Sequence, residues 1–140
     1  MNFLLDTNAV SEWVKPRPNP GLIRWMESAD EDRVFLSVIS LAELRYGVER
    51  LAAGARRIRL EQWLQDELPL RFESRILSVD HEVAEAWGRT ISRGEALGRP
   101  MSAMDAFLSA TAETHRLTLV TPNVSDFPTL KAVVNPWSNP

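Results

Sequence analysis

Short apolar runs alternate along the chain with longer segments of mixed polarity, and the first run begins at residue 3. Residues 3–5 (Phe-Leu-Leu) contain no polar residue, and the run stops at Asp6, Thr7 and Asn8. A run of this kind predicts a strand that is buried on both faces, as in a parallel sheet. Similar runs predict further strands over 34–38, 75–79, 117–121 and 132–135.

Helix signals occupy the spaces between these strands. The apolar spacing and the capping residues predict helices over 9–14, from Pro20 to Asp30, from Ser40 to Gly54, over 58–68, after Asp80 and over 103–115, with one short helical turn over 123–127. Strands that alternate with helices imply right-handed crossovers. We therefore expect an α/β fold in three layers, with a mostly parallel central sheet of four to five strands and helices on both faces. A single domain over 1–140 is expected, with 136–140 as a flexible tail.

Composition narrows the class of protein. The 140 residues are 44% hydrophobic and 25% charged, which is ordinary for a globular domain. No apolar run approaches the roughly 20 residues that span a bilayer. The absence of cysteine excludes disulfides, thiolate zinc sites and cysteine nucleophiles. With no basic leader before the first strand, a cytoplasmic location is the expectation.

The balance of charge argues against a protein that coats nucleic acid unspecifically, because the net charge is −3. The basic residues are nevertheless unusual, since Lys15 and Lys131 are the only lysines among 16 cations. Arginine binds phosphate or carboxylate in a bidentate manner, so this bias is compatible with an anionic partner.

Four acidic residues take equivalent places in the predicted fold. Asp6 follows the first strand, and Glu43 lies at the start of the helix after the second strand. Asp105 begins the helix before the fourth strand, and Asp126 follows that strand. In a parallel sheet the ends of strands and the starts of the helices that follow them share one edge. The four carboxylates are therefore expected to converge.

Each acid taken alone also has a structural interpretation. Asp6 is a good N-cap for the next helix. Residues 40–43 (Ser-Leu-Ala-Glu) fit a capping box, and 102–105 (Ser-Ala-Met-Asp) have the same form. Four converging carboxylates would repel one another, however, and a hard divalent cation compensates such charge. Thr7, Asn8, Thr121 and Asn123 add oxygens and amides that are suited to orienting the carboxylates or bound water.

These blocks together resemble a PIN-domain ribonuclease, most closely the VapC-like toxins of bacterial toxin–antitoxin pairs. The resemblance rests on residues 6–8 (Asp-Thr-Asn), Glu43 in the helix start 40–44, residues 101–105 (Met-Ser-Ala-Met-Asp) and residues 121–127 (Thr-Pro-Asn-Val-Ser-Asp-Phe). It covers essentially the whole chain, in order. Two departures stand out: many relatives have a basic residue in place of Pro122, and a proline in place of Ser102.

The resemblance implies a Mg²⁺- or Mn²⁺-dependent endoribonuclease that a cognate antitoxin inhibits, with transfer RNA as a common target and homodimerisation as a family expectation. It makes Asp6 and Asp105 the principal metal ligands, with Glu43 completing the site and Asp126 binding a second ion or its water. Thr7 and Asn8 would support Asp6, while Thr121 and Asn123 would support Asp126. Apart from the resemblance, Arg45, close to Glu43 in sequence, is a candidate for facing or pairing with the site, and Arg99 is a candidate for contacting the RNA backbone. A solvated surface position is the alternative for each.

Three alternatives accompany this interpretation. A PIN-like DNA nuclease shares the metal chemistry, and a catalytically silent PIN-like binding module shares the fold. An aspartyl phosphatase would need a second Asp two residues after Asp6, where the chain has Asn8. Only His81 and His115 offer imidazole chemistry, and both occupy positions at predicted helix ends where a structural role is expected.

The tryptophans bear on partners. Trp63 and Trp87 fall on apolar helix faces and are expected in the core. Trp13 and Trp25 lie on two short helices that flank the proline-rich loop over 15–20, so they either line a groove for a partner or pack against each other. The resemblance implies that the antitoxin lies in a hydrophobic groove and offers a basic side chain to the acids.

Overall fold

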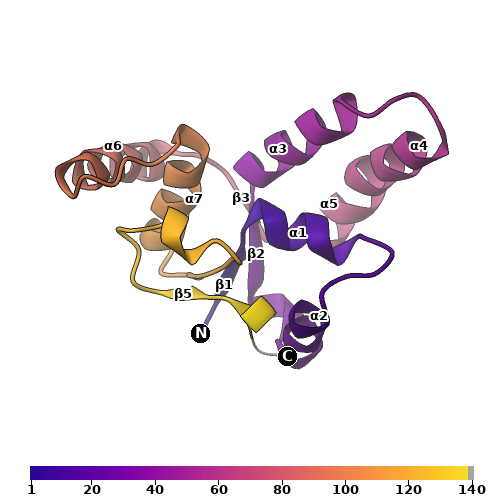
Figure 1. Cartoon of the computed structure of the whole chain (residues 1–140), viewed down its shortest axis with the longest axis horizontal. Coiled ribbons are helices and arrows are strands. Elements are labelled where there is room, and N and C mark those ends of the chain that lie inside the picture. The colour runs from indigo at the N-terminus through magenta and orange to yellow at the C-terminus, as the bar shows by residue number, and fades with distance from the viewer. Residues whose placement is uncertain (139–140) are drawn as a thin grey trace.

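A five-stranded parallel sheet forms the centre of the molecule, with the strand order β3-β2-β1-β4-β5. The computed structural model describes residues 1–138. The strands are β1 (Phe3–Leu5), β2 (Val34–Ser37), β3 (Ile76–Leu77), β4 (Thr118–Val120) and β5 (Val133–Val134). Every pair is parallel, which confirms the predicted α/β class. The first strand of the chain is thus the middle strand of the sheet (Figure 1).

Helices follow the strands as the pattern predicts. They are α1 (Thr7–Trp13), α2 (Pro20–Ser28), α3 (Val38–Glu49), α4 (Ala55–Gln62), α5 (Leu68–Arg71), α6 (His81–Ala96) and α7 (Ala103–Thr114). Shorter helical turns are η1 (Glu31–Arg33), η2 (Trp63–Glu67, a π-helix), η3 (Val124–Asp126) and η4 (Pro136–Ser138). The predicted caps Asn19, Asp80 and Ser102 all accept backbone N–H donors, so these three helix starts are confirmed.

The alternation of side chains along the strands produces the three layers. Leu4 packs on one face with Leu108 of α7, whereas Leu5 packs on the other face with Val10 of α1. All four are buried, as the absence of polar alternation in residues 3–5 requires. Figure 1 shows α6 and α7 on one side of the sheet and α1, α4 and α5 on the other.

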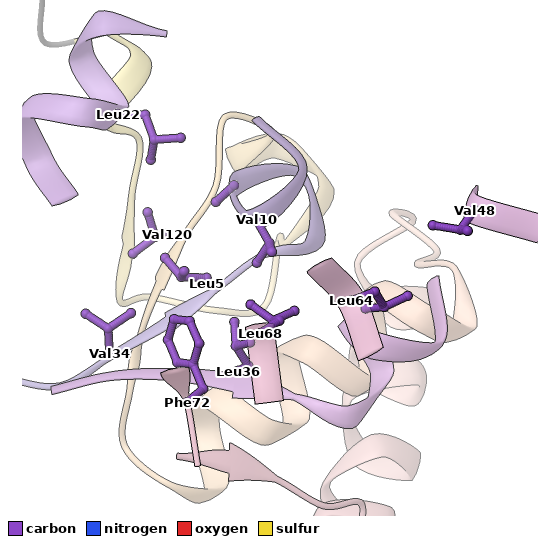
Figure 2. Packing of buried hydrophobic residues seen from close by; sticks show 11 residues of the cluster. Leu5, Val10, Leu22, Val34, Leu36, Val48, Leu64, Leu68, Phe72 and Val120 are labelled. Atoms are coloured by element: carbon purple, nitrogen blue, oxygen red, sulfur yellow. The ribbon is translucent and has the colours of Figure 1, made fainter. Parts of the chain in front are cut away.

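The larger hydrophobic cluster lies under α1, α2 and α5. Figure 2 shows Leu5, Leu36 and Val120, from three adjacent strands, among the side chains that form it. Phe72 and Leu68 close this cluster and are almost completely buried. The cluster therefore holds α1, and with it the segment after Asp6, rigidly against the sheet.

Several predicted helix boundaries differ from the structure, and two of these differences have a clear physical cause. Helix α3 begins at Val38, because the buried Ser37 at the end of β2 caps it by accepting from the N–H of Ile39 over 3.0 Å. The predicted capping box at 40–43 is therefore absent, and Glu43 lies in the second turn. Pro69 does not end its helix either, since it occupies the first turn of α5, after the π-helix, where a missing N–H costs little.

The C-terminal segment makes contacts with the rest of the fold, while the flexible tail over 136–140 stays a prediction. Pro136 is buried, and Trp137 packs against the larger cluster. The backbone N–H of Trp137 donates to Asn135 Oδ1. The remainder of that prediction, residues 139 and 140, lies outside the described residues. Over residues 1–138, no helix has both the length and the apolar character needed to cross a bilayer.

Candidate active site

Asp6 is the centre of the site and is only 3% exposed. It caps α1, since Asn8 donates its backbone N–H to Asp6 Oδ1 over 3.0 Å. The side-chain amide of Asn8 lies 3.5 Å from Asp6 Oδ2. Asp6 can therefore cap α1 and also serve in a functional site. The cap uses mainly Oδ1 and holds the carboxylate at the carboxyl end of β1.

Thr121, at the end of the neighbouring strand β4, fixes the second oxygen of Asp6. Its buried hydroxyl donates to Asp6 Oδ2 and accepts from the backbone N–H of Asn123 over 3.0 Å. Thr121 was predicted to support Asp126, whereas its direct partner is Asp6. Asn123 acts through its backbone, linking the turn that carries Asp126 to Thr121.

Thr7 connects the first turn of α1 to Glu43 on α3. Its Oγ1 donates to Glu43 Oε1 over 2.6 Å and lies 2.9 Å from the hydroxyl of the buried Ser40. A threonine hydroxyl has one proton, so Ser40 donates to Thr7 when Thr7 donates to Glu43. The predicted support role of Thr7 thus concerns Glu43. Ser40 was missed as part of the site because its sequence context indicated a helix cap.

Asp105 lies in the first turn of α7, where its backbone N–H donates to the Ser102 hydroxyl over 3.2 Å. Burial raises the pKa of this carboxyl, and a hydrogen bond with the Ser102 side chain opposes that shift. The negative charges of Asp126, Asp6 and Glu43 raise the pKa further. The four predicted acids are therefore electrostatic neighbours, although their elements are far apart in sequence.

Asp126 is exposed and lies in the turn η3, directly after β4. In the described part of the chain none of the four acids is paired with a lysine or arginine. The suggestion that Arg45 faces the site is not supported, because Arg45 pairs with Glu49 at 3.6 Å. The negative charge of the site is consequently left without a cationic side chain to neutralise it.

The chemistry of these donors suits a hard cation. All four groups are carboxylates, and the repulsion expressed in the raised pKa of Asp105 is relieved by positive charge. Among residues 1–138, no three acidic or histidine side chains converge tightly enough to enclose an ion by themselves. This open arrangement fits Mg²⁺, which keeps several waters and needs only one or two protein carboxylates together with substrate phosphates.

A groove of about 720 Å³ lies between α1, α3 and α4, and its lining includes none of the four acids. Its floor is apolar and includes Leu44, Val48 and Trp63, while Arg56 and Arg59 lie at its margin. Trp63, which was expected in the core, is only partly buried and also lines this groove.

The two N-terminal tryptophans do not form the large groove. Trp13 packs edge-on against Phe72, with ring centroids 6.2 Å apart, and Trp25 packs against Phe3 at 4.9 Å. The predicted mutual packing of Trp13 and Trp25 is therefore replaced by two separate aromatic pairs. Trp87 is partly buried, as it stacks on Phe107 while its N–H donates to the Ala103 carbonyl.

Comparison with known proteins places this geometry in a family. Residues 3–128 match the family model of the PIN domain. Toxin FitB of Neisseria gonorrhoeae is 37% identical over 96% of this chain and 98% of its own. The VapC ribonuclease Y4jK of Sinorhizobium fredii is 28% identical, covering 96% of this chain and 97% of its own.

The fold agrees with a solved structure over nearly the full length. The crystal structure of FitAcB from Neisseria gonorrhoeae superposes with a TM-score of 0.89 at 38% identity, covering 96% of this chain and 98% of that one. The match of both sequence and fold spans all four acidic positions. The chain therefore belongs to the PIN domain family.

Proposed function

We propose that the protein is a metal-dependent endoribonuclease that acts as the toxin of a toxin–antitoxin pair. One observation carries the proposal. Four carboxylates from separate elements gather at the carboxyl edge of the sheet, where burial and then the charges of the other three acids raise the pKa of Asp105. None of the four is paired with a cationic side chain in residues 1–138. The names of the relatives FitB and Y4jK, a toxin and a ribonuclease, support the same activity.

Asp6 and Asp105 are the proposed principal metal ligands. When bound, Mg²⁺ or Mn²⁺ supplies Lewis-acid activation of water and stabilises the charge that develops on the phosphodiester. Asp6 enters this site already oriented, because Asn8 and Thr121 fix its two oxygens. Glu43 completes the site from α3, held by Thr7. Asp126, from its exposed turn, orients water or a second ion.

The reaction is hydrolysis, in which water attacks phosphorus and the P–O bond to one ribose breaks. A mechanism with paired histidines finds no support in this fold. His115 follows the C-terminal end of α7, whereas Asp105 lies at the N-terminal end of that helix. His81 is exposed at the start of α6 and lies 3.7 Å from Glu85. Neither imidazole is placed among the four acids.

The cognate antitoxin is the proposed protein partner, and the groove of about 720 Å³ is its proposed seat. The apolar floor suits the hydrophobic face of an antitoxin segment, and the arginines at the margin suit acidic residues flanking that face. The groove borders α3, which also carries Glu43, so a segment that leaves it can bring a basic side chain to the acids. Neutralisation by such a side chain would both block and stabilise the site.

The test is a cleavage assay with protein freed of any co-purifying partner. Native protein and Asp6→Asn are incubated with a single-stranded RNA, a transfer RNA or a single-stranded DNA, each with Mg²⁺, Mn²⁺ or excess chelator. We expect RNA cleavage that requires metal, and a loss of at least about 100-fold in the variant, which corresponds to roughly 2.7 kcal/mol of transition-state stabilisation.

The outcomes separate the alternatives. Preferential cleavage of DNA would identify a DNA nuclease, and a folded native protein without activity would identify a binding module. Cleavage that survives chelator or equals native in Asp6→Asn would exclude the carboxylate–metal mechanism. Light scattering during chromatography of the same sample tests the proposed homodimer.

A further inference from the structure

A second hollow, of about 420 Å³, lies at the part of the acidic site that α7 and η3 form. It is lined by Asp105 and Asp126, by Ser125, and by the cation Arg99. Residues 100–115 and 117–130, which carry the two acids, contain no lysine or arginine. Arg99 is therefore the cation that the fold itself brings to this part of the site.

The backbone that leads from α6 to Arg99 is constrained by its glycines and by a hydrogen bond. Gly98, just after α6, has a φ of +69°, in the left-handed region that favours glycine. The N–H of Arg99 then donates to the Gly94 carbonyl over 2.9 Å. A Cβ atom at Gly94 would lie 3.0 Å from the Arg99 carbonyl oxygen, a tight contact that glycine avoids. These constraints fix the point from which the arginine side chain extends.

One arm of the Arg99 guanidinium is already engaged. Its Nη2 donates to the Ser125 carbonyl over 2.9 Å, and Ser125 immediately precedes Asp126 in the turn η3. No ion pair involving Arg99 occurs anywhere in residues 1–138, although the side chain is exposed. Arg99 therefore steadies the turn of Asp126 while its positive charge and its other N–H groups stay available.

We propose that Arg99 binds a backbone phosphate of the RNA strand beside the acidic site and, through Ser125, positions Asp126. The inference rests on the proposed ribonuclease function. A strand that approaches four carboxylates is repelled, and a fixed guanidinium next to them provides local attraction. The planar fork of arginine suits both tasks, because separate N–H groups serve the carbonyl and the phosphate at the same time.

Two substitutions separate the two roles. Arg99→Gln removes the charge but keeps an amide donor for the Ser125 carbonyl, whereas Arg99→Ala removes both. The matched control is Arg89→Gln, which removes the same charge from an exposed arginine on α6. Thermal unfolding of all variants verifies that each is folded, and Arg99→Lys provides a second charged variant if Arg99→Ala does not fold.

Binding is measured without cleavage, by fluorescence anisotropy of a labelled single-stranded RNA in excess chelator over a range of salt concentrations. We expect Arg99→Gln and Arg99→Ala to bind roughly tenfold more weakly than native. The slope of log affinity against log salt should become shallower by about 0.7, the value for one phosphate contact on a single strand. Arg89→Gln should keep the native slope.

Cleavage kinetics then test the positioning role. We expect a raised KM in both Arg99 variants, with kcat close to native in Arg99→Gln and several-fold lower in Arg99→Ala. Native affinity and salt slope in both variants, or an equal loss in Arg89→Gln, would overturn the proposal. Because the binding assay needs no turnover, it gives a result for Arg99 even if the native protein fails to cleave RNA and the proposed function is wrong.

Discussion

The hydroxyl of Thr7 donates to the carboxylate of Glu43 over 2.6 Å, and this bond joins helices that are 36 residues apart along the chain. Thr7 is the first residue of α1, and Glu43 lies in the second turn of α3. Because Thr7 directly follows Asp6, the bond ties the carboxylate from α3 to the carboxylate at the end of β1. One short side chain thus holds Glu43 beside the segment that carries Asp6.

Removal of this hydroxyl should uncouple Glu43 from the site. Thr7→Val keeps the shape of the side chain but not its proton, so we expect a loss of about 1 kcal/mol in the free energy of unfolding. Single-turnover RNA cleavage should slow by roughly tenfold, the equivalent of about 1.4 kcal/mol. Thr7→Ser, which keeps the hydroxyl, should stay near native. Equal cleavage rates in the valine and serine variants would show that the bond does not position Glu43.

The raised pKa of Asp105 predicts a particular dependence of stability on pH. The folded state holds a proton on Asp105 more tightly than the unfolded state does, because burial and the neighbouring acids oppose its charge. Unfolding therefore releases a proton, and the stability contributed by this group falls as the pH rises from its ordinary pKa of 3.8 through the raised folded value. At pH values above the raised folded pKa, Asp105 is charged in the folded protein, and the loss of stability that this charge causes is then constant.

Asp105→Asn removes this charge, so in metal-free buffer the variant should melt at a higher temperature than native near neutral pH. The difference should shrink as the pH falls through the raised pKa toward the ordinary value of 3.8, because the native carboxyl then takes up its proton in the folded state. Thermal melting curves recorded in chelator across this pH range measure the difference in melting temperature. Asp66→Asn, at an exposed position, is the control. A variant that melts below the native protein at neutral pH would contradict the assignment.

Helix α5 carries two leucines that differ strongly in burial. Leu68 is 1% exposed and belongs to the larger hydrophobic cluster, whereas Leu70 is 74% exposed. Leu68→Ala should lower the free energy of unfolding by about 2–5 kcal/mol, because it deletes buried methyl groups and leaves a cavity. Leu70→Ala should change it by less than about 0.5 kcal/mol. Urea denaturation measures both, and similar losses at the two positions would mean that the helix is placed differently.

Gly47 on α3 lines the groove proposed for the antitoxin, and a Cβ atom there would meet nothing within 4 Å. Gly47→Leu should therefore extend a side chain into the groove from an unobstructed Cβ and raise helix stability by about 0.5–1 kcal/mol, since glycine is a poor helix former. Gly88→Leu on α6 is the control, because its surroundings are equally open but lie outside the groove.

The binding readout is calorimetric titration with the partner that co-purifies with the native protein. Gly47→Leu should bind this partner at least about tenfold more weakly, which is roughly 1.4 kcal/mol, while Gly88→Leu should bind it normally. Both variants should cleave RNA at the native rate once the partner is removed. Unchanged binding by Gly47→Leu would show that the antitoxin binds at another surface of the protein.

The arrangement of the layers could be predicted from the sequence because its causes are local. Unbroken apolar runs indicate strands that are buried on both faces, and Leu4 and Leu5 do pack in opposite layers. Capping residues such as Asn19 and Ser102 mark helix starts, because a short polar side chain satisfies N–H groups that the helix leaves free. The candidate acids could be named in the same way, from their places at the ends of predicted elements.

Errors arose where two local signals competed. Ser37 and Ser40 are both credible caps, and only the end of β2 decides in favour of Ser37. Pro69 usually signals a helix end, but a π-helix before it places it in a first turn where it is tolerated.

What the sequence determined by itself is the class of fold and a set of four candidate acids, because periodicity, caps and strand ends are properties of neighbouring residues. The tertiary structure alone decided which side chains hold those acids. Thr121 reaches Asp6 across 115 residues, Ser40 joins Thr7, and Arg99 reaches the turn of Asp126. Such contacts depend on how two elements pack against each other. A local sequence pattern cannot predict them, because it does not determine which distant side chains come within hydrogen-bonding distance.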